Sequence, residues 1–216
     1  DERGLLLMFD EVQAGHFRTG KFQSWQRILE NEDVDLVPDA VAMAKSLGGG
    51  FPIGAFWVRE KFADMLSAGS HASTFGGTPL ACAVALRIFD VIERDSLAEN
   101  AHSLGTFLLE QLRKSVGNVV REVRGLGLMI GIEFQPEFNA INVVKRLHER
   151  GVLTVPAGNS VIRLLPPLNL SRIEAEEGLR AIEDVIDSLA PARSPSRAAR
   201  PRRSPPGGDV VDLART

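Results

Sequence analysis

The feature that most constrains the fold is a continuous run of five apolar residues, Leu5 to Phe9, followed directly by Asp10 and Glu11. An unbroken apolar run of this length predicts a strand that is buried on both faces of a parallel sheet. Because such sheets need covering helices, the run indicates an α/β protein. Ligands bind beyond the carboxyl ends of strands in these folds, so Asp10 is a candidate site residue.

Apolar segments of strand length alternate with helical patterns through the rest of the chain, as in α/β proteins. Pro79 suits the first turn of a helix with Thr78 as its N-cap, and Ser171 with Glu174 forms a capping-box pattern. Gly151 is a helix-stop signal. The expected strands are 5–9, 40–44, 53–58, 119–134 (a pair), 152–155 and 161–165, and the expected helices are 22–29, 79–94, 97–116, 139–150 and 171–189.

The chain divides near residue 100, into a larger sheet domain over 1–99 and a smaller α+β domain over 100–190. Residues 191–216 contain five Pro, six Arg and two acidic residues, a composition typical of a disordered tail. An arm that binds nucleic acid is the alternative, but we favour a solvated tail.

Composition excludes several classes of protein. The net charge of −3 gives no overall indication of nucleic-acid binding. The single cysteine, Cys82, excludes a disulfide framework and a multi-cysteine metal site. No apolar run approaches the roughly 20 residues of a membrane span, and no signal peptide is visible. We therefore expect a cytoplasmic protein. Since the chain begins with Asp1 and enters a strand at once, we also expect further sequence upstream.

A lysine stands beside three consecutive glycines in the stretch AKSLGGGFPIGA, residues 44–55. The order excludes a phosphate-binding P-loop, whose glycines precede its lysine. Lys45 follows an apolar segment, and a lysine amine in such a place can attack carbonyl groups. A solvated loop lysine is the alternative that the residue alone leaves open.

Other candidates are individually ambiguous. Asp10 suits a cation such as a protonated ring nitrogen or a metal, or else a loop cap. The four histidines are scattered, so we expect no metal site. Ser73 and Thr74 lie beside two glycines, where hydroxyl and N–H groups suit a phosphate, although an ordinary turn is equally compatible. Arg163 lies in an apolar run and needs an anion, either an internal carboxylate or that of a substrate.

Residues 125–131 carry Gly-x-Gly-x-x-x-Gly, which resembles a dinucleotide fingerprint loosely. The spacing differs from the fingerprint and no helix follows, so we reject a Rossmann site.

Six motifs in this order give a specific resemblance over about residues 4–190. The chain resembles class-III aminotransferases, pyridoxal-phosphate enzymes of the aspartate aminotransferase fold, and most of all the acetylornithine aminotransferases among them. The motifs are FDEVQAG, HFRTG, PDAVAMAKSLGGGFPIGA, HASTFGGTPLACAVA, VRGLGLMIGIEF and VIRLLPPLNLS.

The resemblance implies a role for each candidate. Lys45 matches the lysine that forms a Schiff base with the cofactor and then moves a proton. Asp10 matches the aspartate that pairs with the pyridine nitrogen, which keeps the ring an electron sink. Arg163 matches the arginine that grips the substrate α-carboxylate. The remaining matches are Val12 on the ring face, Gln13 at the ring hydroxyl, and Thr74, with Ser73 beside it, at the cofactor phosphate from the neighbouring subunit of a dimer.

The resemblance also implies a reaction and a missing part. An amino group would pass from acetylornithine, or from ornithine, succinyldiaminopimelate, 4-aminobutyrate or a diamine, to 2-oxoglutarate. Residues 1–99 would be the C-terminal part of a large cofactor-binding domain, and the family's first half would be absent. We therefore expect a fragment that is inactive alone. The alternatives are a non-catalytic remnant that acts as a binding partner and a nucleic-acid binder that acts through its tail.

The chain departs from the family pattern at a few positions. His16 and Phe17 precede Arg18 where many relatives carry a second glycine. Phe75 replaces a frequent tyrosine, and Thr78 replaces a frequent asparagine.

Overall fold

The described residues form two sheets, and the first, which contains the N-terminal strand, is mixed instead of fully parallel. A computed structural model describes residues 3–190, so the tail predicted for 191–216 lies outside the described residues. The sheet has the order β1-β2-β3, with β1 at Met8–Asp10, β2 at Ala40–Met43 and β3 at Ala55–Val58. β1 runs parallel to β2, and β2 runs antiparallel to β3.

The prediction of a strand over 5–9, buried on both faces, was wrong in extent and in burial. β1 begins only at Met8, and Leu5 precedes it with 72% of its surface exposed. Among the described residues β1 has a hydrogen-bonded neighbour on one side alone, which is β2. Apolar residues also remain exposed on β3, at Phe56 and Trp57. Part of the apolar surface of this sheet is therefore uncovered by the described residues.

Short helices and one long helix accompany this sheet. They are α1 (Ser24–Ile28), the 3-10 helices η1 (Lys45–Gly48) and η2 (Glu60–Leu66), and α2 (Pro79–Arg94). The predicted start of α2 at Pro79 is confirmed, and Thr78 occupies the N-cap, but its hydroxyl makes no capping hydrogen bond. The chain turns at Ser96, which has a positive φ of 52°, before the next helix begins.

The second sheet has the order β4-β5-β7-β6 and is antiparallel between all neighbours. Its strands are β4 (Val120–Leu126), β5 (Met129–Phe134), β6 (Val155–Pro156) and β7 (Val161–Leu164). The strand expected at 152–155 is reduced to the two residues of β6. The helices are α3 (Leu97–Leu112), α4 (Ala140–Glu149) and α5 (Arg172–Leu189), and a 3-10 turn, η3 (Arg113–Ser115), follows α3.

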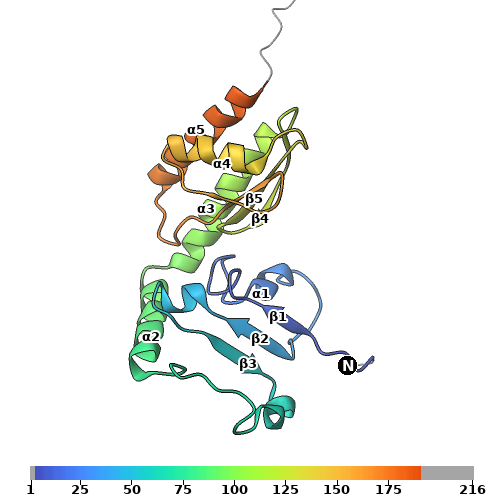
Figure 1. Ribbon diagram of the computed structural model, residues 1–216, viewed down its shortest axis with the longest axis vertical. Coiled ribbons are helices and arrows are strands. Elements are labelled where there is room, and N and C mark those ends of the chain that lie inside the picture. Colours follow the sequence, from blue (N-terminus) through green and yellow to red (C-terminus); the bar gives the residue numbers. More distant parts are fainter. Residues whose placement is uncertain (1–2, 191–216) are drawn as a thin grey trace, which may run out of the picture.

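These three helices and the second sheet share one hydrophobic core. Side chains alternate between the two faces of β5, so Ile130 and Ile132 are fully buried while Gly131 lies on the other face. The core draws its apolar residues from all three helices and from β4, β5 and β7. Figure 1 shows the result as two lobes, with this core in the upper lobe and the β1-β2-β3 sheet in the lower lobe.

Local signals set the helix ends in the upper lobe. The predicted capping box at α5 is confirmed: the Glu174 N–H donates to Ser171 Oγ at 3.2 Å, and the Ser171 N–H donates to the Glu174 carboxylate at 2.8 Å. Asn139 caps α4 by accepting from the Ile141 N–H at 2.9 Å. Gly151 then ends α4 with a φ of 80°, which favours glycine.

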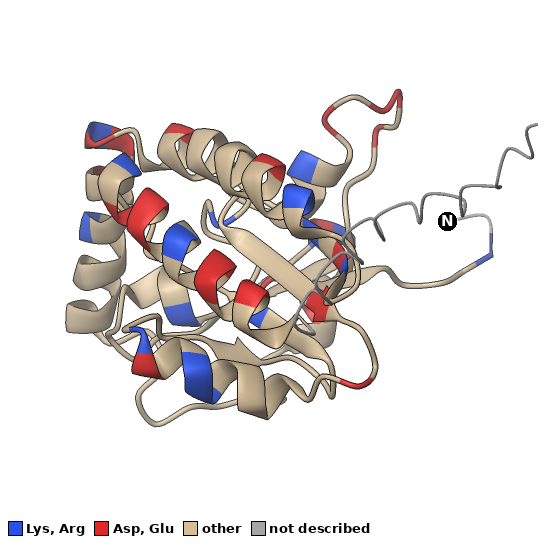
Figure 2. Cartoon of the chain, turned by 90° about the horizontal axis from the view of Figure 1, so that it is seen from above, with Lys and Arg blue, Asp and Glu red and all other residues tan. Residues whose placement is uncertain are grey.

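Basic and acidic residues are interspersed along the helices seen from above in Figure 2. On α5, for example, Arg172 pairs with Glu176 at 2.7 Å, one turn along the helix. Among residues 3–190, no helix has the length and apolar content that crossing a membrane requires.

Candidate active site

The carboxyl ends of β1 and β2 bring Asp10 and Lys45 to the same edge of the lower sheet. In the parallel register Asp10 pairs with Ala42, and the next N–H, of Glu11, donates to the Ala42 carbonyl at 2.9 Å. Lys45 begins η1 two residues after β2 ends at Met43. The predicted position of each residue at or just after a strand end is therefore confirmed, and the structure adds that the two strands are neighbours.

The carboxylate of Asp10 is exposed at this edge, where one oxygen accepts a hydrogen bond from the Val12 N–H at 3.0 Å. Val12 and Gln13 follow directly and are half-buried. Among the described residues Asp10 forms no salt bridge, so its carboxylate is available to a bound cation.

Lys45 has a strained backbone and an exposed side chain. Its φ of 48° lies in the left-handed region, which residues other than glycine rarely adopt. Two of the following glycines are explained by packing. A Cβ at Gly48 would lie 2.7 Å from Ile53, and a Cβ at Gly49 would lie 2.5 Å from Ile88 of α2. Gly50, with a φ of 112°, has nothing within 4 Å of a Cβ and leaves open space at its surface.

A buried polar group beneath this edge was missed by the sequence analysis. His16 is 1% exposed, and its Nδ1 lies 3.1 Å from Oγ of Ser46, the residue after Lys45. Glu11 is equally buried and accepts from the Ser24 N–H at 3.0 Å and from the Ser24 hydroxyl at 2.6 Å. Burial lowers the pKa of His16, and the carboxylate of Glu11 partly offsets this effect. In the sequence, the feature that could have indicated this buried group is the pair His16 and Phe17, which stand before Arg18 where a glycine would be expected from the family pattern.

The loop that carries Arg18 belongs to the lower lobe and forms hydrogen bonds with the upper lobe. Its guanidinium donates to the carbonyl of Pro166, and its own carbonyl accepts from the Leu128 N–H at 3.0 Å. Gly127 is pressed between this loop and α3: its Cβ would lie 2.7 Å from the Arg18 carbonyl oxygen, and a Cβ at Gly105 would lie 2.2 Å from the Gly127 oxygen. Gly127 and Gly105 thus allow the backbones of the Arg18 loop, the β4–β5 turn and α3 to lie in close contact.

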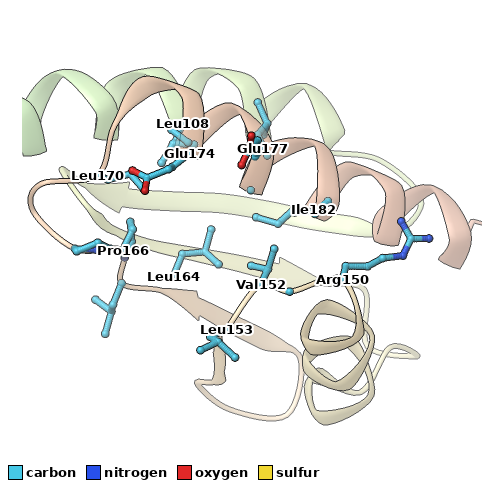
Figure 3. A pocket seen from close by; sticks show the side chains of 17 residues that line it. Leu108, Arg150, Val152, Leu153, Leu164, Pro166, Leu170, Glu174, Glu177 and Ile182 are labelled. Carbon is cyan, nitrogen blue, oxygen red and sulfur yellow. The ribbon is translucent and has the colours of Figure 1, made fainter.

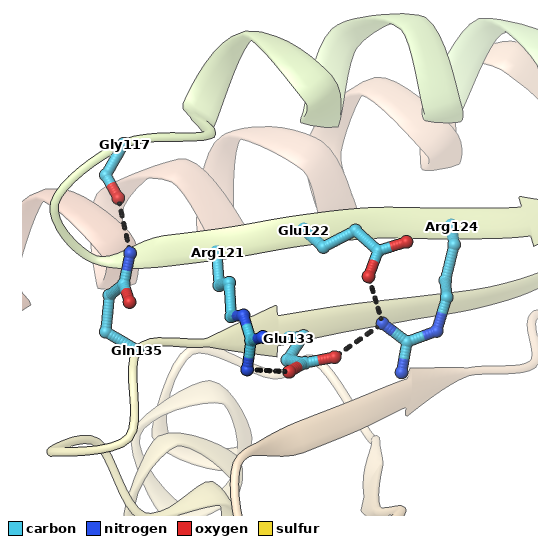
Figure 4. A network of polar contacts seen from close by, with 6 residues as sticks. All are labelled: Gly117, Arg121, Glu122, Arg124, Glu133 and Gln135. Carbon is cyan, nitrogen blue, oxygen red and sulfur yellow. Dashed lines mark hydrogen bonds and ion pairs between the residues drawn. The ribbon is translucent and has the colours of Figure 1, made fainter.

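Arg163 lies on β7, on the face of the upper sheet opposite the core. It pairs in register with Gly131, and its Nε is buried without a hydrogen-bond partner among the described residues. Glu133 shares this face, but its carboxylate forms salt bridges with Arg121 at 3.0 Å and Arg124 at 2.6 Å. Figure 4 shows both ion pairs. The hydrogen bond that Arg124 donates to Glu133 also raises the pKa of Arg124. Arg163 has no salt bridge within residues 3–190, so an internal carboxylate does not satisfy it.

Comparison with known protein families identifies the family of this chain. A family model described as aminotransferase class-III matches residues 1–186. The chain belongs to the class-III aminotransferase family. It is 41% identical to the acetylornithine aminotransferase of Lactococcus lactis over 86% of this chain and 48% of that protein. It is 36% identical to the [LysW]-aminoadipate semialdehyde transaminase of Deinococcus radiodurans, over 97% of this chain and 47% of that protein.

A solved aminotransferase structure has the same fold. The ornithine aminotransferase of Toxoplasma gondii superimposes with a TM-score of 0.78 at 34% identity, over 87% of this chain and 44% of that one. That structure is described as having partial occupancy of PLP at its active site. The chain spans about half the length of the curated relatives it matches.

The residues at the sheet edge fit the cofactor of class-III aminotransferases, pyridoxal phosphate. The cofactor needs an anion for its ring nitrogen and an amine for its aldehyde, which are the groups of Asp10 and Lys45. The structure does not bring every candidate to this edge. Ser73 and Thr74 are exposed in the turn before α2, and no hydrogen bond joins them to Asp10, Gln13 or Lys45 in the described part of the chain.

A cavity of about 560 Å³ lies elsewhere in this aminotransferase chain. Figure 3 shows it in the upper lobe, between α5, the end of β7 and the segment after α4. Its lining is largely apolar, with Arg150, Glu174 and Glu177 near it, and includes none of the candidate site residues. In the described residues, no cluster of three or more His, Cys, Asp or Glu side chains could hold a metal ion.

Proposed function

We propose that the complete protein is a pyridoxal-phosphate aminotransferase that moves an amino group from acetylornithine, or a similar ω-amino donor, to 2-oxoglutarate. The observation that carries the proposal is the register of β1 and β2. This register sets the carboxylate of Asp10 and the Lys45 side chain at the same edge of the lower sheet. The membership of the chain in the class-III aminotransferase family supports the proposal as well. The proposal includes a place in arginine biosynthesis, which rests on the acetylornithine aminotransferases among the relatives.

The chain's own residues would hold and orient the cofactor. When bound, pyridoxal phosphate supplies an aldehyde that accepts amino groups and a ring that delocalises electrons. Asp10 would keep a proton on the ring nitrogen, Val12 would pack on the ring, and Gln13 would donate to the ring hydroxyl. Ser73 and Thr74 would bind the phosphate across a homodimer interface. Both residues are exposed and lie far in sequence from Asp10 and Lys45. This supports a role in which they bind the cofactor phosphate of the second subunit.

Lys45 and Arg163 would carry out the substrate steps. The Lys45 amine would hold the cofactor covalently, and once a substrate amine displaces it, it would move the proton at the reacting carbon. Arg163 would bind the α-carboxylate of donor and acceptor through its planar fork of N–H groups. The buried Nε without a partner supports this role, because such a donor is costly to leave unsatisfied.

The proposed partners are two small molecules, an amino donor and a 2-oxo acid, and a second subunit. Neither nucleic acid nor a membrane is included. We place the protein in the cytoplasm, a location with which the single cysteine of this chain is compatible.

The test is glutamate formation from 2-oxoglutarate by the full-length protein with a panel of donors: acetylornithine, ornithine, succinyldiaminopimelate, 4-aminobutyrate and a diamine. We expect acetylornithine to have the highest kcat/KM. Lys45→Ala should reduce turnover to background, while Lys145→Ala on the exposed face of α4 should not. A higher kcat/KM for another amino donor would replace acetylornithine as the proposed donor. Unchanged turnover by Lys45→Ala would overturn the reaction.

A further inference from the structure

We propose that His16 is a positioning residue that holds Lys45 in place through Ser46. The inference rests on the proposed function, because it assigns His16 to the turn that carries the cofactor lysine. The contact is direct: Nδ1 of His16 lies 3.1 Å from Oγ of Ser46, and Ser46 is the neighbour of Lys45.

The turn that carries Lys45 needs such support. A φ of 48° at a lysine persists only where the surroundings hold the backbone in that conformation. Two backbone hydrogen bonds do part of this work, from the Leu47 N–H to the Ala44 carbonyl at 3.0 Å and from the Gly49 N–H to the Ser46 carbonyl at 3.1 Å. The bond between His16 and Ser46 adds a side-chain restraint from a different segment of the chain.

His16 is itself firmly fixed, so it can serve as an anchor. Its N–H donates to the Phe22 carbonyl at 2.6 Å, and its ring meets the edge of the Phe22 ring with centroids 5.9 Å apart. The side chain is 1% exposed, which leaves it little room to move. The ring centroid of its neighbour Phe17 lies 5.7 Å from that of Phe22 and 6.3 Å from that of Phe89 in α2. The loop therefore packs against α2 as well.

The anchor also links the two segments that carry the proposed chemistry. His16 belongs to the loop that leaves β1 at Asp10, whereas Ser46 belongs to η1 after β2. This hydrogen bond therefore adds a side-chain link, beyond the β1–β2 pairing, between the lysine turn and the segment of Asp10, Val12 and Gln13. Catalysis by a covalently held cofactor requires these two segments to keep a fixed separation.

The experiment uses the full-length holoenzyme and four variants: His16→Ala, Ser46→Ala, the double variant and His16→Asn. Asparagine tolerates the left-handed backbone of residue 16 and offers a hydrogen-bonding group near the position of Nδ1. The readouts are the dissociation constant for pyridoxal phosphate, from the absorbance of the bound cofactor, and the fraction of Lys45 that borohydride fixes to it. His102→Asn, a half-buried histidine on α3, is the control.

We expect each alanine variant to weaken cofactor binding about three- to ten-fold, the range that one lost hydrogen bond produces. The double variant should be no weaker than either single variant, because both remove the same contact. His16→Asn and the control should stay close to wild type. Wild-type affinity in Ser46→Ala, additive losses, or an asparagine variant as weak as alanine would overturn the role of His16.

Two further outcomes separate this inference from the proposed function. If wild-type Lys45 takes up no pyridoxal phosphate, the proposed function fails and the role of His16 fails with it. If the wild type binds normally and the variants do too, only the role of His16 fails. Should His16→Ala not fold, Ser46→Ala decides alone, because it removes a single hydroxyl group and leaves the anchor in place.

Discussion

The guanidinium of Arg18 donates a hydrogen bond to the carbonyl of Pro166, 148 positions further along the chain. Pro166 follows β7, the strand that carries Arg163, whereas Arg18 lies in the loop after Asp10. This contact thus connects the proposed cofactor segment with the proposed carboxylate-binding strand. The hydrogen bond from Leu128 to the Arg18 carbonyl, at 3.0 Å, reinforces it.

Arg18→Met should destabilise the full-length protein by about 1–3 kcal/mol, because it leaves the partly buried carbonyl of Pro166 without its charged donor. Urea unfolding measures the loss. The matched control is Arg87→Met on α2, where an exposed arginine pairs with Asp90 at 3.1 Å, and we expect a change within about 0.5 kcal/mol there. Equal effects in the two variants would show that the contact between the lobes contributes no stability of its own.

Two helical glycines should respond oppositely to alanine. Gly105→Ala in α3 would place a Cβ 2.2 Å from the Gly127 oxygen, and we expect a loss of more than about 1 kcal/mol. Gly178→Ala in α5 meets nothing within 4 Å and should gain about 0.5–1 kcal/mol from helix propensity. Thermal unfolding midpoints of the full-length variants give the signs, and a stabilised Gly105→Ala would contradict the packing at this junction.

Arg163→Gln should raise the half-saturating concentration of donors that carry an α-carboxylate about ten- to hundred-fold, since a charge-assisted pair is lost. A diamine offers no such carboxylate and serves as the matched control substrate, so its half-saturating concentration should not change. The donor half-reaction of the full-length enzyme is measured without 2-oxoglutarate, because that acceptor also carries an α-carboxylate. An equal rise for both donor types would mean that Arg163 supports the fold instead of the substrate.

Stability should fall as the pH drops below about 6.5, the ordinary pKa of histidine. Burial lowers the pKa of His16 in the folded protein, so the unfolded chain binds the proton first and acid favours unfolding. The contribution is complete above the unfolded pKa and is lost toward the lower folded pKa. Thermal midpoints at pH 7.5 and 5.5 should differ less in His16→Asn than in the wild type. An identical difference would exclude His16 as a cause.

The sequence predicted those parts of the fold that local signals determine. The capping box at Ser171, the start of α2 at Pro79 and the stop at Gly151 are each set within a few residues, and all three are confirmed. The strand ends at Asp10 and near Lys45 were also placed correctly, because apolar runs that stop at polar residues mark them. The glycines of residues 125–131 lie in a hairpin, whose turn is residues 127–128 between β4 and β5.

The features that sequence reasoning missed depend on contacts between distant segments. Nothing in the pattern around His16 indicates a bond to Ser46, and nothing near Arg18 indicates a partner at Pro166. The exposure of Leu5 was misjudged for a related reason. Burial depends on which strands lie beside a run, and the described residues supply β1 with one neighbour.

The most direct test of the central claim is to locate the residue that holds the cofactor. Full-length protein saturated with pyridoxal phosphate is reduced with borohydride, digested and mapped by mass spectrometry, with Lys45→Ala treated in parallel. We predict that the pyridoxyl mass lies on the peptide containing Lys45 and is absent from the variant. A label on another lysine, or none in the wild type, would contradict the assignment and favour a non-catalytic binding partner.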